Sequence, residues 1–350
     1  MSADADPPRR PGRFWLFAPA AALALVCAGW AAAWFVIRDR VAEGLDAWLA
    51  NETAAGRRWE CPERAIAGFP FRIEVSCARL ALEAPEGTLG AGRLRTVTQV
   101  YQPRLTVFEL DGPLRASLGG VALEGSWDSL RGSFHSAPHG FARASLVVAG
   151  AKLRATGPMG DAALSARHAE AHARPGPDAD AAVEVAVKAE GAAVPALDGL
   201  LGGTEPLDAD LEARVTQARP LPRPSRQDVE RWREAGGRIG LDRLTLAKGE
   251  RRLEARGELA LDELRRPAGR LDVAVLGLSD LLPALMTGRL PGAGGALGSA
   301  AGALGGFMGG RRTVPAPGAK PSPLPAIRLE NGRILFGLAP VPGVRLMPLY

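Results

Sequence analysis

One uninterrupted apolar run constrains this chain more than any other feature. Residues 14–37 read FWLFAPAAALALVCAGWAAAWFVI, 24 residues without a charged side chain. A helix of that length crosses the ~30 Å hydrocarbon layer of a bilayer. We therefore expect a transmembrane helix that anchors everything after it.

The flanks of this run predict its orientation. Aromatic residues lie towards its two ends, as interfacial aromatics do: Trp15, Trp30, Trp34 and Phe35. Three arginines precede the run and two follow it: Arg9, Arg10 and Arg13, then Arg38 and Arg40. The excess places residues 1–13 in the cytoplasm and predicts a single-pass protein of the bacterial inner membrane with its C-terminal domain in the periplasm.

Two other interpretations of the run stay open. A cleavable signal peptide has a shorter apolar region of ~7–15 residues, although Ala31, Ala32 and Ala33 offer small residues for a cut. Lipidation at Cys27 needs a small residue just before the cysteine and Leu three before it, where this chain has Val26 and Ala24. The run therefore favours a permanent anchor, with Cys27 as an inert thiol facing the membrane.

The other two cysteines, Cys61 and Cys77, bracket the segment PERAIAGFPFRIEVS. If the chain turns back at Phe69, antiparallel pairing places position 61 opposite position 77, at a spacing that a disulfide accepts. Such a bond requires an oxidising compartment. Two reduced thiols, or half of a metal site, are the alternatives, but a zinc site needs four ligands and no second cysteine pair exists.

The centre of this segment, GFPFR, supplies the candidate site residues. Gly68 and Pro70 are turn residues. Phe69 and Phe71 are expected to pack the hairpin onto the next layer. Arg72 is a candidate binding residue, although the sequence favours a solvated arginine at a strand edge.

Beyond the anchor the dominant pattern alternates with period two. Residues 38–56 first predict an amphipathic helix that continues the anchor and ends at Gly56. Alternating strands are then expected at 94–101, 105–108, 114–118, 121–127, 144–153, 162–170, 183–189 and 207–215, followed by an antiparallel meander over 239–278. Strands that return without helical crossovers predict a mainly β fold: an open antiparallel sheet, curved into a trough or half-barrel, with a few short helices.

The rest of the chain is divided by composition. Within a β-rich periplasmic domain over 57–289, helices are expected at Gln227–Ala235 and after Ser279. Residues 290–325 are rich in Gly, Ala and Pro, and a weak helix and a mobile linker stay equally open for them. Residues 326–350 predict one strand, 333–338, and an extended tail. Aromatic residues make up only 5% of the chain, so we expect a thin core.

Three motifs together carry a resemblance to a known family. They are LDAWL at 45–49, the Cys61–Cys77 segment with GFPFR at 68–72, and the closing GLAPVP at 337–342 with PLY at 348–350. The chain resembles the proteobacterial domain of unknown function 2125, which brings no activity or catalytic residues. More loosely, its anchor and repeated strands are similar to AsmA-type envelope proteins, whose β-sheet troughs are associated with lipid movement or outer-membrane assembly.

The sequence contains few arrangements of residues that are typical of a catalytic or metal site. The histidines form two pairs with a spacing of four: His135 with His139, and His168 with His172. On a strand such rings lie on one face but ~13 Å apart, too far to share an ion. No GxSxG elbow precedes a helix, and no cysteine has an evident histidine partner. We expect no metal site, no cofactor and no enzyme, with an unrecognised hydrolase as the minor alternative.

The sequence thus predicts a non-enzymatic envelope module that binds lipid or an envelope partner along the curved sheet. A concave apolar face could hold an acyl chain if the chain's own helices do not fill it. A structural or assembly scaffold without a ligand is the alternative. Arginines are interleaved with acidic residues, so the net charge of +5 does not indicate a nucleic-acid partner.

Overall fold

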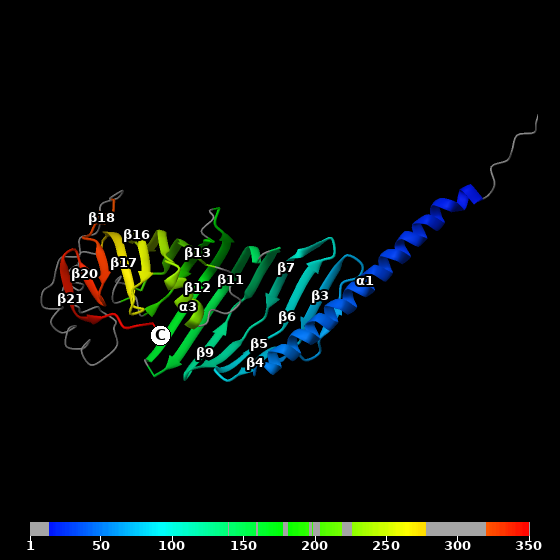
Figure 1. The fold of residues 1–350 in the computed structure, drawn as a ribbon, viewed down its shortest axis with the longest axis horizontal. Helices are drawn as coiled ribbons and strands as arrows, with labels where there is room; N and C mark the ends of the chain where they lie inside the picture. The colour runs from blue at the N-terminus through cyan, green and yellow to red at the C-terminus, as the bar shows by residue number, and fades with distance from the viewer. Residues whose placement is uncertain are drawn as a thin grey trace, which may run out of the picture.

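One long helix joins a large antiparallel sheet in the computed structural model of this chain (Figure 1). The residues that the structure describes are 14–138, 140–158, 160–177, 181–195, 198, 204–218, 226–277 and 320–349. Within these ranges the chain is mainly β, and 21 strands belong to one sheet. The predicted fold class, a transmembrane-type helix followed by an open antiparallel sheet, is confirmed.

Helix α1 (Phe14–Ala54) is 41 residues long and includes both the apolar run and the predicted amphipathic helix. Its N-terminal half projects beyond the sheet and its C-terminal half lies alongside the first strands (Figure 1). The helix is long and apolar enough to cross a membrane. Because no Gly or Pro interrupts residues 38–43, the helix continues past the apolar run without a break.

The first eleven strands form two arms that merge on one strand. Their bounds are β1 (Arg58–Glu60), β2 (Ala65–Ala67), β3 (Arg72–Cys77), β4 (Leu80–Ala84), β5 (Gly87–Ala91), β6 (Leu94–Gln99), β7 (Gln102–Leu110), β8 (Leu114–Leu118), β9 (Val121–Ser126), β10 (Ser129–Ala137) and β11 (Gly140–Gly157). One edge of β11 pairs with β10 over its first half and with β9 over its second half. One arm is therefore β2-β3-β6-β7-β10 and the other is β1-β4-β5-β8-β9.

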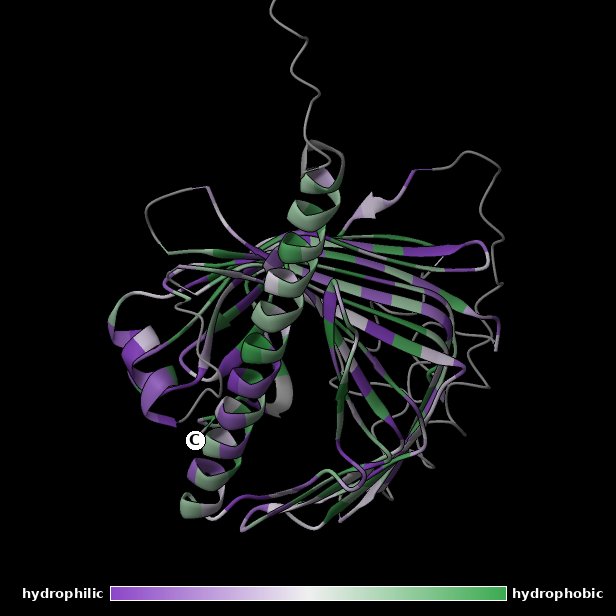
Figure 2. Cartoon of the chain, turned by 90° about the vertical axis from the view of Figure 1, so that its right-hand side faces the viewer, coloured by the Kyte–Doolittle hydropathy of each residue, from purple (hydrophilic) through white to green (hydrophobic). Residues whose placement is uncertain are grey.

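Beyond β11 the sheet is a simple meander. The strands are β12 (Gly160–Pro175), β13 (Val183–Ala192), β14 (Leu207–Val215), β15 (Ile239–Lys248), β16 (Arg251–Leu261), β17 (Pro267–Leu276), β18 (Ser322–Pro323), β19 (Ile327–Glu330), β20 (Arg333–Phe336) and β21 (Ala339–Arg345). Helix α3 (Arg226–Glu234) lies between β14 and β15. Figure 2 shows the sheet curved into a trough, with α1 crossing in front of one end.

The ladder register aligns uncharged, mostly apolar residues across twelve neighbouring strands. A single row of directly paired positions runs from β2 to β17: Ile66, Val75, Thr96, Phe108, Gly132, Leu146, Ala171, Val187, Leu211, Leu244, Ala255 and Val273. We call these residues the apolar row. Twelve strands at about 4.8 Å spacing make it about 50 Å long.

The opposite face of the same strands is charged. Directly paired positions there include Arg95, Glu109 and Arg131, and further along Glu170, Lys188 and Asp210. Side chains on this face join in ion pairs such as Arg131–Glu109 at 2.9 Å and Arg174–Glu184 at 2.7 Å. Exposed ion pairs of this kind add little stability, so their main effect is to make this face of the sheet hydrophilic.

The core is thin, as the composition predicts. Its main cluster lies at the C-terminal end of the apolar face and consists of Ala166, Ala192, Leu207, Ala255, Val273 and Val275. Within the described ranges no large side chain is fully buried. At the centre of the apolar row, Leu146 and Val187 each keep 36% of their surface exposed.

Strand existence was predicted better than strand extent. The alternating pattern located β8 and β14 to the residue. It missed other strands, among them β4, β5, β10 and β19, and it assigned residues of β21 to an extended tail. The tail prediction was wrong because Pro340 lies at an edge, where a missing N–H is tolerated in a ladder. Residues 1–13, the helix after Ser279 and the segment 290–319 lie outside the described residues.

The thin core gives a first prediction. Val273→Ala should lower the free energy of unfolding by about 2 kcal/mol, because it removes two buried methylene equivalents from the main cluster. Val187→Ala, on the same face but exposed, should cost less than about 1 kcal/mol. Urea unfolding followed by circular dichroism checks both, and equal losses would contradict the uneven burial of the face.

Candidate functional site

The C-terminal end of α1 is clamped to the sheet by one buried carboxylate. Glu52 accepts hydrogen bonds from Arg57 at 2.7 and 2.8 Å and from the indole of Trp59 at 3.0 Å. Trp59 also packs against Trp48, with ring centroids 5.7 Å apart. The pKa of Arg57 is raised by its hydrogen bond to Glu52. These contacts fix the angle at which the helix leaves β1.

A second clamp lies 20 residues earlier on α1, at the β2–β3 turn. The indole of Trp30 donates to the carbonyl of Pro70, and that of Trp34 donates to the carbonyl of Arg72, both at 2.9 Å. The ring of Phe69 meets Trp34 edge-on at 5.4 Å. We call this contact between α1 and the β2–β3 turn the helix–hairpin junction.

Gly68 is required by the shape of this turn. Its φ is +107°, and a Cβ there would lie 2.6 Å from the carbonyl oxygen of Arg72. That carbonyl is the one that accepts the hydrogen bond from Trp34. A side chain at position 68 would therefore displace the group that binds the helix.

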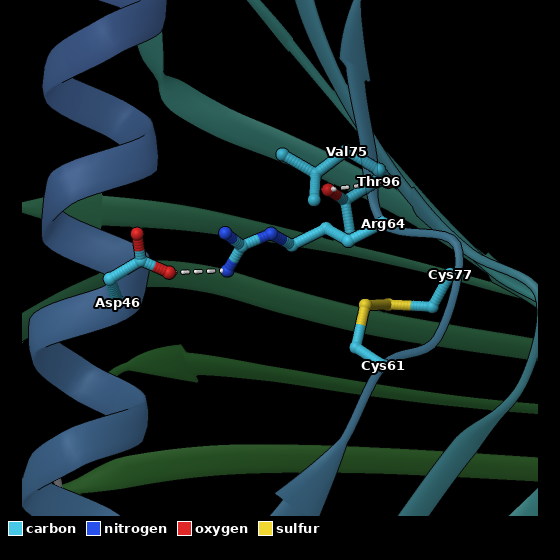
Figure 3. The surroundings of a disulfide bond; sticks show 6 residues. All are labelled: Asp46, Cys61, Arg64, Val75, Cys77 and Thr96. Atoms are coloured by element: carbon cyan, nitrogen blue, oxygen red, sulfur yellow. Dashed lines mark hydrogen bonds and ion pairs between the residues drawn. A yellow bond between two sulfur atoms is a disulfide. The ribbon is translucent and has the colours of Figure 1, made fainter.

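The predicted disulfide is present, but the predicted register is wrong. Cys61 and Cys77 are bonded with their Cα atoms 5.0 Å apart (Figure 3). In the ladder, however, Ala65 pairs with Ser76, so the hairpin turns about 1.5 residues later than expected and Cys61 lies outside β2. The disulfide instead ties the segment before β2 to the end of β3, beside the ion pair of Arg64 with Asp46 of α1 at 2.7 Å.

Phe69 and Phe71 do not pack onto a second sheet layer. They contact α1, where Phe71 lies 6.1 Å from Trp30, and they stay 55% and 60% exposed. Local sequence patterns do not indicate this contact, because α1 and the β2–β3 turn are distant along the chain, with Trp34 and Arg72 separated by 38 positions. Arg72 lies exposed at the start of β3, as expected, 3.5 Å from Glu74.

Glu74 connects the hairpin to the next strand. It accepts hydrogen bonds from Arg95 of β6 at 2.6 and 3.0 Å. These bonds hold the pKa of Glu74 below its ordinary value of 4.5, and the nearby charge of Arg72 acts in the same direction. β3 is thus held by α1, the disulfide and a bidentate ion pair.

A pocket lies on the apolar face, where α3 covers the ends of β14–β16. Trp232 of α3 donates to the carbonyl of Thr216 at 2.7 Å, which holds the helix over the sheet. The pocket has a volume of about 730 Å³, within the range of small-molecule sites. Apolar side chains line most of it: Val215, Val229, Trp232, Ile239, Leu259, Leu261 and Leu349.

The second histidine pair, His168 and His172, belongs to the charged face. His168 and His172 lie on β12, and each ring approaches the carboxylate of Glu170 between them, at 4.0 and 3.5 Å. His139 lies outside the described residues. In the part of the chain that the structure describes, no group of three His, Cys, Asp or Glu side chains is arranged to hold a metal ion.

Comparison with known proteins gives a family and no activity. The profile described as "Uncharacterized protein conserved in bacteria (DUF2125)" matches residues 34–344. No curated protein and no solved structure matches the chain. The match begins at Trp34, so it includes the Glu52 clamp, the disulfide, the apolar row and Trp34 of the helix–hairpin junction, but not Trp30.

Removing the disulfide should destabilise the hairpin arm. Cys61→Ser combined with Cys77→Ser opens a loop with a sequence separation of 16, and we expect a loss of about 3 kcal/mol in the chain-entropy account. Cys27→Ser, at the exposed free thiol, is the control and should have no effect. Urea midpoints of the full chain in detergent measure both; equal midpoints would show that the bond does not stabilise the arm.

The Glu74–Arg95 pair predicts a small acid sensitivity. A carboxylate with a lowered pKa stabilises the fold above its unfolded-state pKa, and this contribution is lost as the pH falls through the lower folded-state value. Glu74→Gln should therefore flatten the decline in stability below about pH 4.5, by less than about 1 kcal/mol because Arg95 is partly exposed. Stability measured against pH, with Glu83→Gln as a surface control, tests this sign.

Proposed function

Since this chain belongs to the bacterial DUF2125 family, whose description assigns no activity, we propose its function from the geometry: a non-enzymatic, membrane-anchored module that binds lipid acyl chains along its apolar face. The anchor is α1. The ligand surface is the apolar row together with the pocket beneath α3.

The proposed location is the inner membrane of a bacterium, with the sheet in the periplasm. The disulfide supports this side, because such bonds persist in oxidising compartments. The arginines before the apolar run support the same orientation.

The observation that carries the proposal is the row itself. Twelve directly paired strand positions in succession present no charged side chain, and the middle of the row is partly exposed. Apolar surface of this extent is costly to leave in water, and continuous exposed patches generally mark interaction sites. Each acyl methylene buried there contributes about 0.8 kcal/mol.

The chemistry of the row favours an aliphatic ligand over a protein partner. Its strands use their backbone N–H and C=O groups within the sheet, so the row offers contact but few hydrogen bonds. Specific protein interfaces combine an apolar centre with about one hydrogen bond per 100–200 Å². An acyl chain needs none. The alternative function, a scaffold without a ligand, predicts a different result in the experiment below.

Photo-crosslinking of lipid tests the proposal. The full chain is reconstituted in nanodiscs that contain a phospholipid with a diazirine in its acyl chain, irradiated, and digested for mass spectrometry. We expect covalent lipid on peptides of β11–β16, well beyond the membrane. Leu146→Glu should reduce this labelling at least about tenfold, because a carboxylate on the row must lose its water when an acyl chain binds.

The matched control is the adjacent residue on the opposite face. Val147→Glu introduces the same side chain on the charged face, between Arg131 and Glu170 of the neighbouring strands, and should leave the labelling unchanged. If lipid attaches only to α1 in the wild-type protein, the sheet does not bind lipid and the scaffold alternative is favoured. If both variants reduce labelling equally, the face assignment is wrong.

A further inference from the structure

Two turns at the same end of the sheet expose three aromatic side chains. Phe69, Phe71 and Tyr101 are 55%, 60% and 67% exposed. The β2–β3 and β6–β7 turns adjoin, because the N–H of Val100 donates to the carbonyl of Phe71 at 2.9 Å. We call these three residues the aromatic tip. In a chain with 5% aromatic residues, this concentration is unusual for a surface surrounded by water.

The helix fixes the level of the aromatic tip relative to a bilayer. Trp34 follows Phe14, the start of the apolar run, by 20 residues of α1, which rise about 30 Å, the thickness of the hydrocarbon layer. Phe69 packs on Trp34, and Phe71 packs on Trp30, one turn closer to the membrane centre. The aromatic tip therefore lies level with the membrane boundary, not above it.

Charges begin where the bilayer would end. On α1 the first charged residues after the apolar run are Arg38 and Asp39, about 6 Å beyond Trp34 along the axis. On the hairpin, Arg72 directly follows the aromatic tip and is exposed. Phe35, Phe69 and Phe71 thus occupy the zone between hydrocarbon and charge, where aromatic side chains are enriched in membrane proteins.

We propose that the aromatic tip inserts into the bilayer that α1 crosses, at the boundary between headgroups and acyl chains on the side of the sheet. The occupant of this surface is phospholipid. The indole–carbonyl bonds of Trp30 and Trp34 hold the turn against the helix, so that helix and hairpin enter the membrane as one unit. The inference rests on the anchor in the proposed function but not on lipid binding by the sheet.

Insertion places the start of the apolar row close to the bilayer. Val75 is four strand residues from Phe71, a distance of about 13 Å. Strand β3 then rises from the membrane with its apolar face already covered near the turn, where Ile73 is buried. The tip sets the tilt of the trough relative to the membrane.

Site-directed spin labelling measures the depth. In a Cys27→Ser background that keeps the native disulfide, nitroxides are attached to Phe71→Cys and, separately, to Tyr101→Cys of the full chain in phosphatidylethanolamine–phosphatidylglycerol nanodiscs. We expect collisions with a water-soluble nickel chelate to be at least about fivefold less frequent than at Leu118→Cys, and collisions with oxygen to be more frequent. Leu118 is the control because it is 63% exposed beside another turn.

A fourth label, Leu25→Cys within α1, separates the possible failures. If the label at position 25 is protected from the nickel chelate but the label at 71 or 101 is as accessible as the one at 118, the inserted tip is overturned and the anchor stands. Access at position 25 as well overturns the anchor and the tip together. Because positions 71 and 101 lie on different turns and are exposed, a folding defect in one variant, detected by circular dichroism, leaves the other to decide.

Discussion

The register of the antiparallel ladder is the constraint on which the rest of this structure depends. Because side chains alternate between faces, a slip of one residue would exchange the two faces of a strand, and in most of the twelve strands it could bring a charged residue such as Glu74, Lys188 or Asp210 into the apolar row. The alternation of apolar and charged residues within each strand keeps this register. On β13, for example, Val187 pairs with Ala171 and Leu211, whereas the next residue, Lys188, pairs with Glu170 and Asp210. A sheet with few large side chains can therefore be specific without a thick core.

Helix α1 is attached to the sheet at two points. An elongated sheet that is joined to a helix by a single linker can rotate about that linker. Glu52 at one end and the Trp30 and Trp34 indoles at the other hold α1 across both arms of the sheet. Two attachment points therefore fix the orientation of the sheet relative to α1.

The sequence predicted what depends on local pattern and missed what depends on distant contacts. Period two gave the strands, and an apolar run gave the helix, because each is encoded by consecutive residues. The predicted pairing of the hairpin was shifted by about three residues. It assumed that the disulfide joins two directly paired residues, whereas the bond joins the segment before β2 to the end of β3. The contact of Trp34 with Arg72 could have been suspected only from the shared surplus of aromatic residues in two segments 38 residues apart.

The composition of the apolar row also bears on how a lipid would move along it. A deep, shape-specific pocket binds tightly at one place, whereas the row offers shallow contact across many strands and is exposed at its centre, at Leu146 and Val187. Phe108 is the largest side chain of the row, and its ring lies over Gly132 of the neighbouring strand. A Cβ at position 132 would lie within 2.1 Å of this ring, so the glycine leaves room for Phe108 and the surface of the row stays level. Under the proposed function, a shallow surface would favour movement of an acyl chain along the row. The pocket beneath α3, far along the sheet from α1 (Figure 1), would supply the added contacts that retain it.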